Sequence, residues 1–253
     1  MIHSDLLALR ISQAGQVTGS VFQPISHIEA SQLEAALISD VISLAQIAMA
    51  SLVEGIAGIS DYRFSWAKVK LYYSGFYSVR AMLMLHKIAI FYIGRSPFTL
   101  EAKPGESAKK RAGNSHTVAF ELFRQNYKND LVLSQQISGL CPLKWIEDKR
   151  SEISYRTAPY VDPESPSEFS SIIGKERLHV QEYCCDDLHL YAFDPDHSML
   201  AYPILLVKRL SELVRNYNIN EIVDINVHYR DILVKSNCFV PAMRVKFPLY
   251  NFK

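Results

Sequence analysis

The chain has 253 residues, 49% of them apolar and 21% charged, which is the composition of a folded globular protein. Its net charge of +1 and its pI near 7.7 exclude a strongly basic protein that coats nucleic acid, but they allow a local basic groove. Aromatic residues make up 11% of the chain and glycine and proline are scarce, which excludes a disordered chain.

We expect a cytoplasmic protein without membrane contact. The first residues, MIHSDLLALRISQAG, lack the features of a signal peptide, and the four cysteines form no CxxC pair. The most apolar stretch, residues 71–94, is long enough to span a bilayer, but Arg80, His86 and Lys87 lie inside it. Because charged side chains are costly in lipid, we interpret this stretch as a buried helix.

The N-terminal region predicts strands followed by a helix. Residues 1–25 are not helical in pattern, and β-branched residues near two glycines favour a loose hairpin. Ser31 and Glu34 fit a capping box, in which each side chain satisfies a backbone N–H of the other residue. Apolar residues then recur at spacings of three and four, at Leu33, Leu37, Val41, Leu44, Ala48 and Leu52. This helix is expected to end near Gly55–Gly58.

The middle of the chain predicts three more helices and a long loop. Apolar and small residues over 65–93 predict a helix that Gly94 caps. Residues 95–114 contain two prolines, two glycines and a run of Lys and Arg, which indicates a long, exposed and mobile loop. Ser115 is placed to cap the next helix, and another helix begins with Pro142 in its first turn.

A polar connector follows, and two further helices are expected after it. Pro159 should end the preceding helix. Ser165 and Glu168 form a second capping box, which predicts a helix that runs to about Tyr183. A further helix is expected over residues 199–215.

In the C-terminal region the spacing of the apolar residues changes from a helical pattern to strict alternation. In VDINVHYR, residues 223–230, apolar and polar residues alternate, and MRVKF at 243–247 repeats this pattern. Alternation of this kind predicts half-buried strands. We expect these strands to form a small sheet that the N-terminal strands complete.

These patterns together predict a mainly α fold, with a bundle of four to five helices and a small β appendage from the chain termini. Residues 1–25 are expected to be an N-terminal extension with strands. Residues 26–160 are expected to form the bundle, and residues 161–253 further helices followed by short strands.

The order of three sequence blocks resembles a known superfamily. Residues 72–85 read YYSGFYSVRAMLML, SHT at 115–117 opens a helix that carries FELF, and a later helix ends in RSEISYRTAPY at 150–160. Over about residues 66–160 the chain is similar to the HEPN superfamily of small helical bundles. The resemblance implies a HEPN-like bundle and a role in a prokaryotic antiviral defence or toxin–antitoxin system.

Many HEPN proteins are metal-independent endoribonucleases, with a motif of Arg, a polar residue, three variable residues and His. The resemblance aligns Arg150 and Ser151 with the first two positions, but the His position falls on Tyr155. A phenol ordinarily titrates near pH ~10 and is a poor acid–base group. RSEISY fits better a branch of the superfamily whose members are not clearly nucleases. We therefore expect a catalytically degenerate subunit that binds a partner protein, nucleotide or RNA, and a metal-independent endoribonuclease is the alternative.

A second Arg-x4-His spacing joins Arg111 to His116, so His116 is a third catalytic candidate beside Arg150 and Tyr155. Basic side chains before a helix N-terminus favour phosphate binding. The expected RNA- or phosphate-binding residues are Arg150, Lys103, Lys109, Lys110 and Arg111.

Several of these residues also have a purely structural interpretation. Arg150 can bond the last carbonyls of its helix, and Tyr155 can pack in the core with its hydroxyl at the edge. Arg80, inside an apolar helix, needs a partner, for which Glu121 and Glu147 are candidates.

No metal or cofactor is expected, because the Cys, His and Asp residues over 179–197 match no usual zinc spacing and no P-loop, GxGxxG, GxSxG or HExxH occurs. The helices carry more apolar surface than one four-helix core needs. We therefore expect a homodimer or a heteromeric protein complex, with RNA or a nucleotide as a further partner.

Overall fold

The computed structural model describes residues 2–19, 21–153, 166–217, 219 and 222–252. Over these residues the protein is mainly helical, so the predicted mainly α class is confirmed. The chain forms two compact units: unit 1 comprises Met1–Leu44 and Val79–Lys128, and unit 2 comprises Ala45–Ser78 and Asn129–Lys253. Two long helices, α2 (His27–Ser60) and α3 (Phe64–Leu85), contribute residues to both units.

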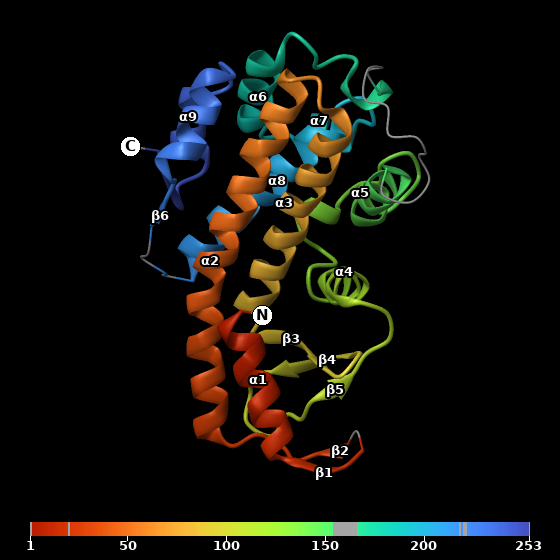
Figure 1. Ribbon diagram of the computed structural model, residues 1–253, viewed down its shortest axis with the longest axis vertical. Helices are drawn as coiled ribbons and strands as arrows, with labels where there is room; N and C mark the ends of the chain where they lie inside the picture. The colour runs from red at the N-terminus through yellow and green to blue at the C-terminus, as the bar shows by residue number, and fades with distance from the viewer. Residues whose placement is uncertain (1, 20, 154–165, 218, 220–221, 253) are drawn as a thin grey trace. The chain divides into compact units, whose positions relative to one another are not determined.

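Unit 1 combines helices with small antiparallel sheets, as Figure 1 shows. Besides its parts of α2 and α3, it contains α1 (His3–Ala14), β1 (Gln16–Thr18), β2 (Val21–Phe22), β3 (Ile88–Ile93), β4 (Ser96–Glu101), β5 (Lys109–Lys110) and α4 (Ser115–Asn126). Strands β1 and β2 pair with each other, and β3, β4 and β5 form a second sheet in that order. A two-residue turn joins β3 to β4, and Gly94 has φ 61° there, which glycine adopts without strain.

A buried ion pair joins α1 to α3 within unit 1. Nη2 of Arg80 donates to both carboxylate oxygens of Asp5, at 3.0 and 3.1 Å. The expectation that Arg80 pairs with Glu121 or Glu147 is therefore wrong. Burial raises the pKa of Asp5, and the nearby Arg80 charge only partly offsets this effect.

The N-terminal region contains one helix that the sequence pattern did not predict, and a second that begins earlier than expected. Residues 3–14 are helical, so the expected hairpin is confined to β1 and β2. Helix α2 begins at His27, and its capping box is formed by Ser26 and Glu29. Glu29 Oε2 accepts hydrogen bonds from the backbone N–H and the hydroxyl of Ser26 at 2.8 and 2.7 Å. The box expected at Ser31 lies inside the helix, because the side chains at 26 and 29 satisfy the first backbone donors instead.

The helix expected over 65–93 is two elements. Helix α3 ends at Leu85, and the β-branched and aromatic run IAIFYI forms β3, where such residues pack well on a pleated surface. The long loop expected over 95–114 is also wrong, because β4 and β5 occupy much of it. Backbone hydrogen bonds from Ile25 to Glu106 and from Gly105 to Ile25, at 2.8 and 3.0 Å, hold the segment between β4 and β5.

The described residues of unit 2 form mainly helices, which Figure 1 shows, together with one short parallel strand pair. Besides its parts of α2 and α3, it contains η1 (Leu131–Leu133), α5 (Pro142–Ser151), η3 (Ser167–Phe169), α6 (Glu176–Cys185), α7 (Leu190–Phe193), α8 (Ser198–Asn216), β6 (Val223–Asp224), α9 (Val227–Lys235), α10 (Pro241–Lys246) and β7 (Tyr250–Asn251). The predictions of a helix with Pro142 in its first turn and of a helix over 199–215 are confirmed by α5 and α8.

Close packing of α2 on α3 depends on two glycines in unit 2. A Cβ added at Gly55 would lie 2.7 Å from the Leu71 side chain, and one at Gly58 would lie 3.1 Å from Ala67 Cβ. Both glycines therefore lie inside α2, which ends only at Ser60, and they do not terminate the helix as expected.

The C-terminal strands were predicted with the wrong period. Of the stretch 223–230 only β6 is a strand, and the rest begins α9, while 243–247 lies largely in α10. Strand β6 pairs with β7 and not with the N-terminal strands. The helix expected up to Tyr183 begins only at Glu176, after a 3-10 turn and Gly174 at φ 74°.

Among the described helices, α2 is long and apolar enough to cross a membrane by length and composition, with a mean hydropathy of 1.8 over an 18-residue window. The protein itself buries 61% of that window, which is how the core helix of a soluble protein also looks.

Candidate functional site

Arg150 lies in the last turn of α5, as the sequence suggests. Its guanidinium carbon is 5.5 Å from the centre of the Tyr72 ring and 5.9 Å from that of Tyr73, which are cation–π distances. Burial raises the pKa of Tyr72, helped by the charge of Glu147 and opposed by Arg150. Tyr155, the other half of the expected motif, lies outside the described residues.

Next to Arg150, Lys149 belongs to a charged network that joins three elements. Glu168 in η3 lies 2.6 Å from Lys149 Nζ and 3.0 Å from the Nζ of Lys68 on α3, and both Glu168 and Lys68 are buried. Burial disfavours the charged form of Glu168. The hydrogen bond from Lys149 and the charge of Lys68 outweigh burial and lower the pKa of Glu168 to about 2. Glu168 therefore joins α3, α5 and η3 through ion pairs. The capping box predicted for it involves Ser165, which lies outside the described residues.

The predicted basic residues of 103–111 lie at the β-sheet of unit 1. Lys109 forms an ion pair with Glu106 at 2.8 Å, and Arg111 Nε donates to Thr99 Oγ1 at 2.9 Å. Lys103 and Lys110 are exposed and make no ion pair with any residue that the structure describes. Two of the four cations thus have a polar partner within unit 1, and the other two have no ion-pair partner among the described residues.

His116 lies in the first turn of α4. The Asn114 side chain, rather than Ser115, caps this helix and accepts hydrogen bonds from the backbone N–H groups of His116 and Thr117 at 2.9 and 3.0 Å. His116 and the four basic residues belong to unit 1, whereas Arg150 belongs to unit 2. The expected site residues that the structure describes therefore belong to two different units.

Positive charge is concentrated in one part of unit 1. Residues 79–128 contain nine Lys and Arg against three Asp and Glu. Besides Lys103 and Lys110, the exposed cations of this segment with no ion pair to a described residue are Arg95, Arg124 and Lys128. A polyanion such as RNA is attracted by such a surface.

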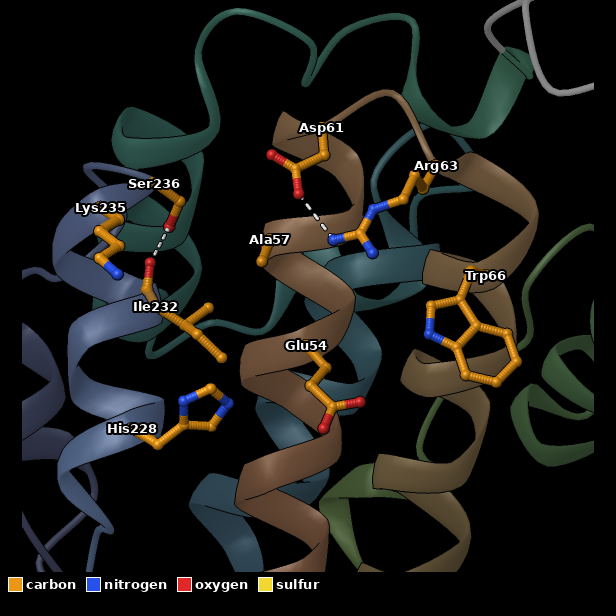
Figure 2. A pocket seen from close by; sticks show the side chains of 9 residues that line it. All are labelled: Glu54, Ala57, Asp61, Arg63, Trp66, His228, Ile232, Lys235 and Ser236. Atoms are coloured by element: carbon orange, nitrogen blue, oxygen red, sulfur yellow. Dashed lines mark hydrogen bonds and ion pairs between the residues drawn. The ribbon is translucent and has the colours of Figure 1, made fainter.

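Unit 2 has an open pocket of ≈ 400 Å³ on helices α2, α3 and α9, shown in Figure 2. Its lining residues are Glu54, Ala57, Asp61, Arg63, Trp66, His228, Ile232, Lys235 and Ser236. In this view α2 lies between α9 and α3, so the side chains of α9 and Trp66 form opposite walls.

The turn between α2 and α3 presents Arg63 to the pocket. The backbone N–H of Arg63 donates to the carbonyl of Gly58 at 2.7 Å, and that of Tyr62 to Ile59 at 3.0 Å. Tyr62 has φ 59°, so this turn is a Schellman motif with tyrosine at the left-handed position.

The end of α9 has the same geometry. The backbone N–H of Cys238 donates to Leu233 at 2.8 Å, that of Asn237 to Val234 at 3.0 Å, and Asn237 has φ 54°. The guanidinium of Arg177 on α6 donates to the Asn237 carbonyl at 3.2 Å. These bonds fix the end of the helix that forms one wall of the pocket.

Both carboxylates of the pocket are neutralised by neighbours. Asp61 accepts a hydrogen bond from Arg63 at 2.6 Å, and Glu54 forms an ion pair with Lys70. Lys235 makes no ion pair with any described residue. The formal charges of the lining residues cancel, but both carboxylates are already paired with a cation, and Lys235 is left as the charge without a carboxylate partner among the described residues.

The sequence analysis singled out none of these lining residues as a site. The alternating pattern at 223–230 would place His228 and Lys235 on opposite faces of an extended chain. In helix α9 the spacings of four and three bring His228, Ile232 and Lys235 to one face. The pocket forms because this segment is a helix and not the expected strand, so no sequence motif indicated it.

A second polar cluster lies on α6, α7 and the segment before α8. The hydroxyl of Tyr183 and Nδ1 of His197 are 2.7 Å apart, the Tyr191 ring lies 5.0 Å from the His197 ring, and His179 Nδ1 lies 3.1 Å from Glu182 Oε2. Burial raises the pKa of Tyr183. Within the described part of the chain, no three His, Cys, Asp or Glu side chains converge as metal ligands.

A scan against protein-family models gives no match, and searches of curated proteins and of solved structures give none either. Any function must therefore be proposed from the residues of this chain.

Proposed function

We propose that this chain is a HEPN-like subunit of a prokaryotic antiviral defence or toxin–antitoxin system, and that it binds RNA without cleaving it. The HEPN-like character rests on the sequence blocks over 66–160. RNA binding is carried by the charge of residues 79–128, where nine cations stand against three carboxylates. Because the sheet holds β4 and β5 in register, these cations are displayed from a fixed framework.

Two observations support binding without chemistry. Tyr155 stands where the superfamily's nucleases have His, and a phenol does not exchange protons near neutral pH. Arg150 contacts the faces of Tyr72 and Tyr73, and burial raises the pKa of Tyr72, so Tyr72 is no substitute for the missing imidazole.

RNA binding can be tested on Lys103 and Lys110, two exposed lysines of residues 79–128 that make no ion pair with a described residue. Lys103→Gln combined with Lys110→Gln should weaken binding of a labelled single-stranded RNA and lower the slope of log affinity against log salt by about 2. Fluorescence anisotropy between about 50 and 200 mM salt measures this slope.

The matched control removes two exposed cations of unit 2, as Lys175→Gln with Arg215→Gln. It changes the net charge equally and should leave the affinity and the slope nearly unchanged. If both double variants weaken binding alike, or if the unmodified protein binds no RNA, the proposal fails.

Cleavage is tested separately. The unmodified protein should leave RNA intact with or without EDTA. Tyr155→His should restore weak cleavage, because an imidazole exchanges protons near neutral pH, and Arg150→Ala in that background should abolish it. EDTA-resistant cleavage by the unmodified protein that disappears in Arg150→Ala would identify the alternative, a metal-independent endoribonuclease.

A protein partner is part of the proposal, as a homodimer or a heteromer. Light scattering should give at least twice the chain mass of 28.8 kDa, or a second protein should co-purify. A 28.8 kDa species alone at micromolar concentration contradicts this part.

A further inference from the structure

The pocket of unit 2 has one aromatic wall. Trp66 is 46% exposed, although tryptophan is usually well buried, and its ring contributes to the pocket lining in Figure 2. Lys70 Nζ lies 5.1 Å from the ring centre, which helps to hold the indole in place. An indole presented in this way offers a flat surface on which the ring of a ligand can stack.

The opposite wall is cationic. His228, Ile232 and Lys235 lie on one face of α9, and Figure 2 shows His228 and Ile232 directed towards α2. Lys235 has no carboxylate partner among the described residues, whereas Asp61 and Glu54 are each already paired with a cation. This wall therefore favours an anionic group on the ligand.

The separation of the two walls restricts the class of ligand. Helix α2 lies between them, and a helix with its side chains is about 10 Å wide. A compact aromatic acid, with its carboxylate directly on the ring, is too short to reach both. The pocket volume of ≈ 400 Å³ falls in the range of about 300–1,000 Å³ that small-molecule sites occupy.

We infer that this pocket binds a nucleoside monophosphate, with the base stacked on Trp66 and the phosphate at Lys235 and His228. The sugar then spans the surface of α2 over the small side chain of Ala57. The inference concerns unit 2 alone and does not depend on RNA binding by unit 1.

The chain contains only two tryptophans, so the fluorescence of Trp66 can be measured alone once the other is replaced. Trp145 is buried at 4% exposure on α5, so Trp145→Phe leaves Trp66 as the only indole signal. In this variant AMP should quench the fluorescence in a saturable manner. Adenosine, inorganic phosphate and 4-hydroxybenzoate should each bind at least about tenfold more weakly, because each lacks one of the two anchors or the spacer.

Two further variants locate the site. In calorimetry with AMP, Lys235→Gln and Trp66→Ala should each weaken binding about tenfold or more, while Lys175→Gln, a lysine of the same unit outside this pocket, should not. Circular dichroism and thermal unfolding check that each variant is folded. The inference is overturned if AMP neither quenches Trp66 nor releases heat, if adenosine or 4-hydroxybenzoate binds as tightly as AMP, or if the folded Lys235→Gln variant binds AMP normally.

Discussion

The two units use their charged residues in different ways. Unit 1 has ten Lys and Arg against seven Asp and Glu, and unit 2 has seventeen against nineteen. In unit 1 most of the nine cations of 79–128 are exposed, and Arg80, Lys87 and Lys109 form ion pairs with described residues. In unit 2 the charges join elements: Glu168 links α3, α5 and η3, and Asp187 receives Lys208 and Lys246 at 2.9 and 2.8 Å.

This difference shows why net charge is a poor guide to function. The chain as a whole has a charge of +1, yet one segment is strongly cationic and the other unit is slightly acidic. Charges that pair inside a unit fix its helices, whereas charges without a partner are left to attract a ligand. The following experiments test whether the two units really differ in this way.

The largest effect is expected for the buried network of unit 2. Glu168→Ala leaves Lys68 without its carboxylate in a buried site, which should lower the free energy of unfolding by about 3–5 kcal/mol. Glu106→Ala in unit 1 removes the exposed ion pair with Lys109 and should cost less than about 1 kcal/mol. Urea denaturation measures both, and equal costs would mean that the two units do not differ.

The next largest effect is expected in the pH dependence of stability, which should have opposite signs for Glu168 in unit 2 and Asp5 in unit 1. The pKa of Glu168 falls from 4.5 to about 2 on folding, so its contribution is present above pH 4.5 and is lost as the pH falls towards 2. This contribution is at most about 3 kcal/mol. The pKa of Asp5 in unit 1 is raised from 3.8, so its contribution decreases as the pH rises through that value.

Unfolding free energies between about pH 5 and pH 2 test these opposite signs. The acid-induced loss of stability should be smaller in Glu168→Gln than in the unmodified protein, and Asp5→Asn should not reduce it. An unchanged acid response in Glu168→Gln would show that the network does not depend on the charge of this carboxylate.

The smallest difference in the free energy of unfolding is expected between alanine substitutions at two glycines, one in each unit. Gly55→Ala in unit 2 places a methyl group 2.7 Å from the Leu71 side chain, which should cost about 1–3 kcal/mol through crowding. Gly94→Ala in unit 1 meets no atom within 4 Å, but φ 61° should cost it about 1–2 kcal/mol.

Crowding at position 55 and positive φ at position 94 are different causes of destabilisation, so a different second substitution should reduce each cost. Gly94→Asn should be tolerated better than Gly94→Ala, because asparagine adopts positive φ more readily. A double-mutant cycle with Leu71→Ala should show strong coupling to Gly55→Ala and none to Gly94→Ala. Coupling of Leu71 to position 94 would contradict the crowding explanation.

The sequence by itself determined the mainly α class, the start of α5 at Pro142 and the extent of α8. These features follow from signals within one helix, such as a proline in the first turn or a long apolar face. The sequence also determined the composition of the basic segment, because lysine and arginine are visible wherever the chain places them.

Only the tertiary structure decided which residues meet. Arg80 pairs with Asp5, and Glu168 with Lys68 and Lys149, across separations that no local pattern encodes. Gly55 lies inside α2 at a place where Leu71 of α3 packs so closely that an added Cβ would be 2.7 Å from it. The pocket in unit 2 exists because residues 227–235 are helical, which brings His228 and Lys235 to one face. Alternating polarity over a few residues is compatible with both a strand and a short helix, and packing against the rest of the unit selects one of them.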